Sequence, residues 1–228
     1  MALHDELSVE VGKIFRERWN ITKGTVVPES EEIGLGNKGI ELDATVLYAD
    51  LAESTNLVDQ HSPDFAGEVY KSYLYCAAKI IRSEGGEITA CDGDRVMAVY
   101  IGDTKNSSAT RTALKINYAV REIISPALNA VYKNGYKLQQ VVGIDTSVLR
   151  AARTGVRGAN DLVWIGRAAN YAAKLTALDA NYPSNITERV YNRLMDEVKT
   201  TQGKPMWERF TWRTTGEIIY RSTWQWRV

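Results

Sequence analysis

Two aspartates, Asp50 and Asp94, occupy positions where an acidic side chain indicates metal chemistry. Asp50 follows the apolar run from Ala44 to Tyr48, and Asp94 lies in the turn of a predicted hairpin. Desolvating a carboxylate at the end of a buried strand is costly unless the carboxylate meets a cation. Two carboxylates brought together repel each other unless a divalent ion joins them. Together the two aspartates predict a metal site, in which we include Leu51, the residue after Asp50.

Each aspartate taken alone has a simpler explanation. Asp50 would cap the helix that follows it, and Asp94 would be an ordinary turn residue. The combination with Glu53, Ser54 and Thr55, which open a helix directly after Asp50, is what indicates a phosphate site. Backbone N–H groups at a helix start bind phosphates, and two metal ions about 3.5–4 Å apart bridge the attacking and leaving oxygens of a displacement. We therefore assign Glu53, Ser54 and Thr55 to phosphate binding.

A third group lies in the segment that begins at Trp164. Asn170 and Lys174 are four residues apart in a predicted helix and share one helix face. An amide beside a cation can orient a ribose or phosphate and neutralise charge that develops in a transition state. A solvated helix face explains the same two residues, and this segment alone favours that explanation.

The apolar pattern predicts the elements that position these side chains. Helices are expected over residues 3–18, 63–83, 109–131 (with a kink or break at Pro126), 167–178 and 187–198; strands over 44–48, 87–91, 95–101, 138–146 and 162–165; and an aromatic hairpin in the tail. Residues 22–40 hold five Gly or Pro residues and are interpreted as a linker. This order predicts an α+β sandwich of ferredoxin-like kind, with a helix and linker over residues 1–40 and the main domain over 41–228.

Composition narrows the function classes. The 228 residues are 44% hydrophobic and 25% charged, with 28 basic and 28 acidic residues. This balance is typical of a globular protein and argues against a general nucleic-acid or membrane-surface binder, which carries a basic surplus. Two cysteines and two histidines are too few for a disulfide scaffold or a structural zinc site. The start lacks a signal segment and no apolar run is long enough to cross a bilayer, so we expect a cytoplasmic protein.

The zero net charge hides an asymmetry. Residues 41–103 contain twelve acidic and four basic residues, a net charge of −8, whereas residues 150–174 contain five basic and one acidic residue, a net charge of +4. An acidic stretch can hold cations and a basic one can hold anions. Two oppositely charged solvated faces account for the same counts, and on charge alone they are the favoured interpretation.

Four blocks of sequence resemble, in their order and spacing, the motifs of the class III nucleotidyl cyclases. They are Val46-Leu-Tyr-Ala-Asp50-Leu, Gly93-Asp-Arg-Val-Met-Ala-Val-Tyr100, Val142-Gly-Ile-Asp-Thr146 and Gly166-Arg-Ala-Ala-Asn170, and the match covers roughly residues 42–178. The resemblance implies a homodimer with catalytic sites at the subunit interface. It implies that Asp50 and Asp94 of one subunit bind two Mg²⁺ or Mn²⁺ ions and that Asn170 of the partner orients the ribose. The acidic segment of one chain would then face the basic segment of the other.

Departures from the family pattern lie at the charged helix position and at the base-reading positions. Most members carry Arg where this chain has Lys174, and lysine keeps the charge but loses the forked geometry. The positions that read a purine are Ala90 and Val163, which is followed by Trp164, and neither Ala nor Val can hydrogen-bond a base. A relaxed purine site or an inactive cyclase would explain this, but the retained carboxylates and Asn170 argue against inactivity.

This combination resembles the pyrimidine cyclases of bacterial antiphage defence, which signal to a separate effector through a cyclic nucleotide. It implies conversion of UTP, in preference to CTP, to the 3′,5′-cyclic monophosphate and pyrophosphate. A pocket walled by Tyr48, Ala90, Val163 and Trp164 would suit a one-ring base, with Tyr48, Trp164 or an arginine near residues 150–157 reading it. Arg213 in the tail is assigned to the triphosphate end. The alternatives are an adenylate or guanylate cyclase with atypical base contacts, and a nucleotide-binding module without catalysis.

Overall fold

A mixed sheet with helices on both faces organises the chain. The computed structural model describes residues 2–156 and 159–228. The sheet order is β10-β11-β7-β5-β2-β4-β3, with β1 added to β2 and β6 added to β5. The strands are β1 (Asn20–Lys23), β2 (Lys38–Leu51), β3 (Glu87–Asp92), β4 (Arg95–Tyr100), β5 (Gln140–Val156), β6 (Ala159–Ile165), β7 (Ser184–Thr187), β10 (Glu208–Thr211) and β11 (Ile218–Ser222), and β8 (Thr200–Thr201) pairs with β9 (Lys204–Pro205). This α+β architecture confirms the predicted fold class.

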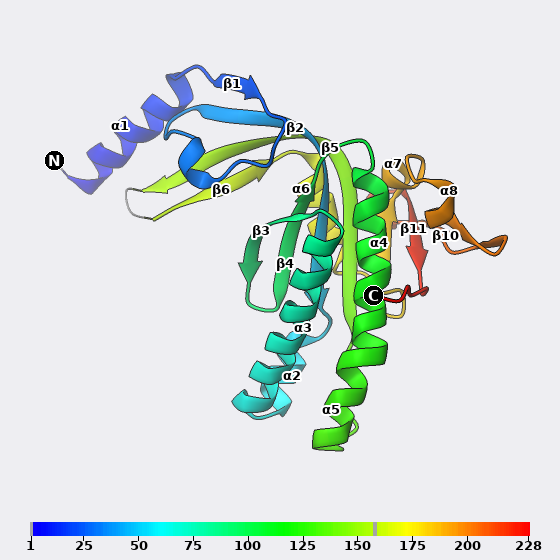
Figure 1. Ribbon diagram of the computed structural model, residues 1–228. Helices are drawn as coiled ribbons and strands as arrows, with labels where there is room; N and C mark the ends of the chain where they lie inside the picture. The colour runs from blue at the N-terminus through cyan, green and yellow to red at the C-terminus, as the bar shows by residue number, and fades with distance from the viewer. Residues whose placement is uncertain (1, 157–158) are drawn as a thin grey trace.

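The helices divide between the two faces of the sheet. They are α1 (Leu3–Arg16), the 3-10 turn η1 (Ser30–Glu32), α2 (Ser54–Gln60), α3 (Pro63–Ser83), α4 (Lys105–Tyr118), the π-helical segment η2 (Ala119–Ile124), α5 (Ser125–Tyr132), α6 (Arg167–Leu175), α7 (Glu188–Tyr191) and α8 (Asp196–Lys199). The larger apolar cluster joins α3 and α4 to one face, and a second cluster joins α6 to the other. In Figure 1, α1 stands apart from the body beyond β1 and β6, and none of its residues is buried.

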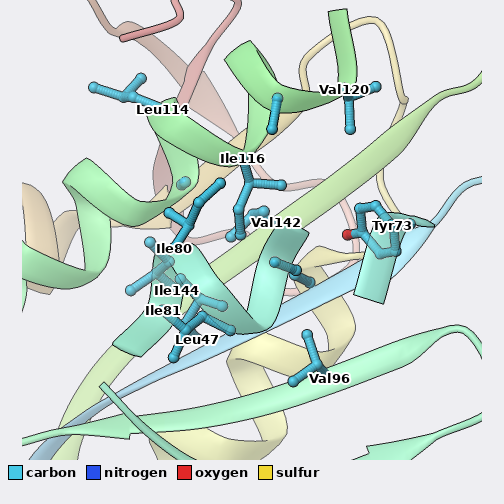
Figure 2. Packing of buried hydrophobic residues seen from close by; sticks show 14 of the residues in the cluster. Leu47, Tyr73, Ile80, Ile81, Val96, Leu114, Ile116, Val120, Val142 and Ile144 are labelled. Carbon is cyan, nitrogen blue, oxygen red and sulfur yellow. The ribbon is translucent and has the colours of Figure 1, made fainter. Parts of the chain in front are cut away.

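Strand β2 shows how alternation assigns side chains to these two faces. Leu47 and Ala49 pack in the larger cluster, which Figure 2 shows around Ile80, Ile116 and Ile144. Val46 packs in the second cluster beneath α6. Successive strand residues point to opposite faces, so even-numbered positions at this end of β2 face α6. The Asp50 side chain therefore points to the face of the sheet that α6 covers.

Several predicted elements are confirmed and others are wrong in detail. The helix over residues 63–83 and the hairpin around Gly93 are confirmed. The helix predicted to break at Pro126 instead passes through the π-helical η2 and continues as α5, with Pro126 in the first turn of α5. A π-turn shifts the hydrogen-bonding pattern, so a proline there does not end the helix.

Two segments correct the sequence-based assignment. The stretch interpreted as a linker over residues 22–40 contains the end of β1 and the start of β2, which pair in parallel. The helix predicted over residues 187–198 is replaced by the short α7 and α8, and residues 184–187 form a buried strand between β5 and β11. Pairing on both sides satisfies the backbone of β7 and overrides local helix propensity. The boundary at residues 40–41 stays a prediction.

Candidate active site

Asp50 ends β2 opposite Arg95, the first residue of β4. The two residues are direct partners in the antiparallel register, and residues opposite each other on one face have side chains close together. The Arg95 guanidinium donates to Asp50 Oδ2 from Nη2 at 2.7 Å and from Nε at 3.1 Å. The Thr176 hydroxyl, directly after α6, lies 3.3 Å from the same oxygen and 2.8 Å from the Ala173 carbonyl. Its single proton serves one of these acceptors, so Asp50 Oδ2 accepts two hydrogen bonds from Arg95 and contacts a hydroxyl.

Asp94 lies next to Arg95 and is less well satisfied. Its Oδ2 is buried and has no hydrogen-bond partner among the described residues. Asp50 and Asp94 both act electrostatically on Tyr73: burial and then these two carboxylates raise the pKa of that fully buried tyrosine. Burial and the same two carboxylates also raise the pKa of the neighbouring Tyr70. The structure therefore brings the two predicted metal carboxylates into one electrostatic neighbourhood.

The residues present fit a divalent cation. A buried carboxylate oxygen without a donor is costly to leave unpaired, and oxygen ligands suit Mg²⁺ and Mn²⁺. Among the described residues there is no group of three or more His, Cys, Asp or Glu side chains arranged to hold a metal. A bound ion would consequently take part of its coordination from water, backbone or the phosphates of a ligand, as Mg²⁺ commonly does.

Of the residues assigned to phosphate binding, Glu53 lines a hollow beside Asp50, whereas Ser54, Thr55 and Arg213 do not. This hollow has a volume of about 520 Å³, and its lining includes Asp50, Leu51, Glu53 and Thr176. The Ala52 N–H is engaged by the Gln139 carbonyl at 3.0 Å.

The helix start itself is set by the backbone of Glu53. Glu53 adopts a left-handed conformation with φ 57° and ψ 33° just before α2. Leu57 N–H makes the first helical bond, to the Glu53 carbonyl. The N–H groups of Ser54 and Thr55 precede that bond and lack the intrahelical partners that later residues have. A left-handed non-glycine residue is strained, and here it turns the chain from Asp50 into α2.

Asn170 and Lys174 both lie on the exposed face of α6. The helix advances about 100° per residue, so Thr176 projects about 200° away from Lys174. Since Thr176 contacts Asp50 of its own chain, Asn170 and Lys174 point away from that aspartate. The helix therefore cannot present all three side chains to one Asp50.

The predicted base-pocket residues do not all meet. Tyr48 and Trp164 both pack beside the second cluster, under α6. Val163, the neighbour of Trp164 in β6, points to the opposite side and lines a hollow under α1. Ala90 is exposed on β3, opposite Met97. The register places Ala90 in line with Tyr48, since both pair with Met97 of β4. Trp164 pairs with Ala151, which pairs with Ile40, eight residues along β2 from Tyr48, so Trp164 and Val163 are placed apart from Tyr48 within one chain.

The basic residues considered for nucleotide binding are likewise not all placed together. Arg150 is engaged with Glu41 at 2.7 Å and lies over the Trp19 ring at 5.1 Å. Arg157 falls outside the described residues. Arg213 is exposed in the turn between β10 and β11, beside Trp212, which packs with Leu175 of α6. Arg213 therefore follows a residue that packs against α6, and no hydrogen bond or ion pair among the described residues joins it to Asn170 or Lys174.

Sequence reasoning missed the contacts that hold α6 in place. Arg167, the first residue of α6, bonds Asp145 Oδ2 through Nε at 3.2 Å and also pairs with Glu217. Asp145 is fully buried and accepts a further hydrogen bond from the Thr187 hydroxyl. Burial raises the pKa of Asp145, although Thr187 and Arg167 act to lower it. The sequence places Arg167 at a predicted helix start, but its partners Asp145 and Glu217 come from distant parts of the chain.

Arg95 and Thr176 were also missed. Both belong to segments that the sequence singled out, yet neither was given a role. The signal for Arg95 was its place at the start of a strand predicted beside the one that ends at Asp50. Only the register between the two strands makes them partners.

Comparison with known proteins places these observations in a family. No protein-family model matches the chain. A uridylate cyclase of Xanthomonas perforans is 54% identical over 231 residues, and one of Burkholderia cepacia is 53% identical over 230 residues; each match spans all of this chain and all of the relative.

Solved structures show the same fold at low identity. The adenylyl cyclase CyaB from P. aeruginosa aligns with a TM-score of 0.68 at 20% identity, covering 83% of this chain and 97% of that one. The guanylyl cyclase Cya2 aligns with a TM-score of 0.69 at 16% identity, covering 82% and 95%. No helix in residues 2–156 and 159–228 is long and apolar enough to cross a membrane. With full-length relatives at 53–54% identity and the fold of the adenylyl and guanylyl cyclases above, this chain belongs to the uridylate cyclase family.

Proposed function

We propose that this protein converts UTP, in preference to CTP, into the 3′,5′-cyclic monophosphate and pyrophosphate, as a homodimer in the cytoplasm. The observation that carries the proposal is the position of Asp50 opposite Arg95 at the end of the β2–β4 pair, with Asp94 directly before Arg95 in the chain, in a chain whose full-length relatives are named uridylate cyclases. The ribose 3′-oxygen forms a bond to the α-phosphorus, the bond from that phosphorus to the bridging oxygen breaks, and the hydroxyl proton passes to solvent.

Each part of the site has an assigned task. Two Mg²⁺ or Mn²⁺ ions, when bound by Asp50 and Asp94, lower the pKa of the 3′-hydroxyl and neutralise the β- and γ-phosphates. The backbone N–H groups of Ser54 and Thr55 face those phosphates. Asn170 orients the ribose and Lys174 neutralises charge in the transition state.

The geometry of α6 supports a shared site. Thr176 occupies the side of the helix that faces its own Asp50, and Asn170 and Lys174 lie on the exposed face, where a second copy can meet them. Assembly of two copies then completes two sites, each with the carboxylates of one subunit and the α6 face of the other.

Base selection is assigned to the residues on the α6 face. Tyr48 is half-buried with its pKa raised by burial, so it stays a neutral hydroxyl that can hydrogen-bond a base carbonyl. Ala90 and Val163 leave the purine-reading positions without a polar group.

The decisive experiment is product identification. The protein is incubated with ATP, GTP, UTP or CTP and Mn²⁺, and each product is identified by mass. Cyclic UMP as the main product supports the proposal. Cyclic AMP or cyclic GMP would instead identify a purine cyclase with atypical base contacts, and nucleotide binding without turnover would identify a regulatory module.

We further propose that the product is an antiphage signal read by a separate effector. The support is the resemblance of the chain to antiphage pyrimidine cyclases. Cells carrying the wild-type protein or Asp94→Asn are infected with phage, and cyclic UMP and survival are measured. A rise in both with the wild type alone supports the proposal, whereas equal survival contradicts it.

A further inference from the structure

Arg95 holds the carboxylate that the proposed metal would need. Its guanidinium donates two hydrogen bonds to Asp50 Oδ2, at 2.7 and 3.1 Å. The contact is built into the fold, because Arg95 and Asp50 are cross-strand partners. Charge-assisted bonds of this geometry are among the stronger ones in proteins.

The surroundings of this pair distinguish it from a structural ion pair. The Arg95 side chain is 44% exposed, against 14% for Asp50, so the guanidinium can leave without unpacking a core. The adjacent Asp94 keeps a buried oxygen without a partner. Arg95 thus supplies one cation where two carboxylates converge, and the charge of the site is left incompletely balanced.

The Arg95 guanidinium lies close to the region where we expect the nucleotide base to bind. Its central carbon lies 6.0 Å from the centroid of the Tyr48 ring, on the side of the proposed base pocket. Guanidinium groups have donors only, and a nucleoside triphosphate offers phosphate and base oxygens as acceptors. Two cations on one carboxylate repel each other, which favours this exchange once a divalent ion and a nucleotide are both present.

We propose that Arg95 binds Asp50 in the free enzyme and transfers to an oxygen of the bound nucleotide, so that metal affinity depends on the nucleotide. Arg95 is in this respect a positioning residue that acts through Asp50. The inference rests on the proposed function, because it takes Asp50 as a metal ligand. It predicts that the free enzyme binds divalent ions weakly and that nucleotide tightens the binding.

Manganese binding tests the exchange without turnover. Free Mn²⁺ is measured by electron paramagnetic resonance with the full-length protein, in the absence and presence of the non-cyclisable analogue α,β-methylene-UTP. Without nucleotide, Arg95→Gln should bind Mn²⁺ about tenfold more tightly than the wild type, a factor within the usual range of site coupling. The tightening caused by the analogue should shrink by a similar factor, and Arg95→Lys should keep most of it.

Two controls separate the possible failures. Arg121→Gln removes an exposed arginine from η2 and should leave Mn²⁺ binding unchanged. Asp50→Asn should weaken Mn²⁺ binding, and if it does not, the metal site itself is wrong. Suppose instead that Asp50→Asn weakens Mn²⁺ binding. If Arg95→Gln then binds Mn²⁺ as tightly as the wild type, or if the analogue tightens its Mn²⁺ binding as much as in the wild type, the exchange is overturned. The metal site still stands in that case.

Discussion

Two aspartate–arginine pairs on the same side of the sheet differ in how completely their charges are satisfied. Asp145 is fully buried, accepts from Arg167 and Thr187, and shares its arginine with Glu217. Asp50 is bonded to an arginine that is half in solvent, and the neighbouring Asp94 has an oxygen with no donor in the described part of the chain.

The difference indicates what each pair does. A buried ion pair with every oxygen bonded contributes to fold specificity and is costly to break by removing one partner. A pair with an exposed arginine beside an unsatisfied acid can exchange partners at little cost. The first pair fixes the start of α6, and the second lies where we expect ligands to bind.

The largest effect is expected at Asp94, beside the Asp50–Arg95 pair. Asp94→Asn removes the charge that we assign to metal binding while keeping the shape of the side chain, and it should lower turnover by about 10³-fold, as loss of a transition-state-stabilising group does. The circular dichroism spectrum and the melting temperature should stay within a few degrees of the wild type. Turnover within threefold of the wild type would show that Asp94 is only a turn residue.

Breaking the Asp145–Arg167 pair should instead affect stability. Arg167→Met leaves Asp145 buried without its cation and should lower the free energy of unfolding by about 3 kcal/mol, measured by urea denaturation. The matched change in the Asp50–Arg95 pair, Arg95→Gln, should lower the free energy of unfolding by less than about 1 kcal/mol because Arg95 is exposed. Equal losses in the two variants would remove the distinction between the pairs.

The α6 helix links the two pairs, and subunit mixing tests that link. Asn170→Ala should lower turnover by about 10²-fold with little change in stability, since Asn170 is exposed. Mixing Asn170→Ala with Asp50→Ala subunits should restore part of the activity, because mixed dimers contain one site with neither substitution. Measured turnover that stays at the level of the separate variants would contradict a shared site.

The smallest expected effect concerns pH. Hydrogen bonds from Arg167 lower the pKa of Glu217 below its ordinary value of 4.5. The stability that Glu217 contributes is therefore full above its unfolded-state pKa and is lost as the pH falls through the lowered value. Glu217→Gln should be less stable than the wild type at pH 7, by under about 1 kcal/mol because the side chain is partly exposed. Urea denaturation should show the two proteins converging as the pH falls below 4.5, and a constant difference would refute the linkage.

The sequence was sufficient to predict the fold class, the helix over residues 63–83 and the exposed face shared by Asn170 and Lys174. These follow from local periodicity, which each segment carries by itself. The positions of Asp50 at the end of a strand and of Asp94 in a hairpin turn were predicted from local sequence patterns as well. The roles of these residues in catalysis remain predictions.

Long-range contacts explain what the sequence could not supply. The bond from Arg95 to Asp50 depends on strand register, and the contact of Thr176 with Asp50 depends on where α6 ends. Residues 184–187 form a strand because β5 and β11 flank them, which no local pattern shows. Val163 and Trp164 were placed in one pocket although neighbours in a strand face opposite sides.

The continuous register of β2 restricts how the length of this chain can change. From Ile40 to Leu51, each residue of β2 pairs in turn with one residue of β5. One inserted or deleted residue in this span would turn the following side chains to the opposite face and would carry Asp50 away from Arg95. Natural variants that gain or lose residues should therefore do so in surface turns, such as the one between β10 and β11, and spare β2.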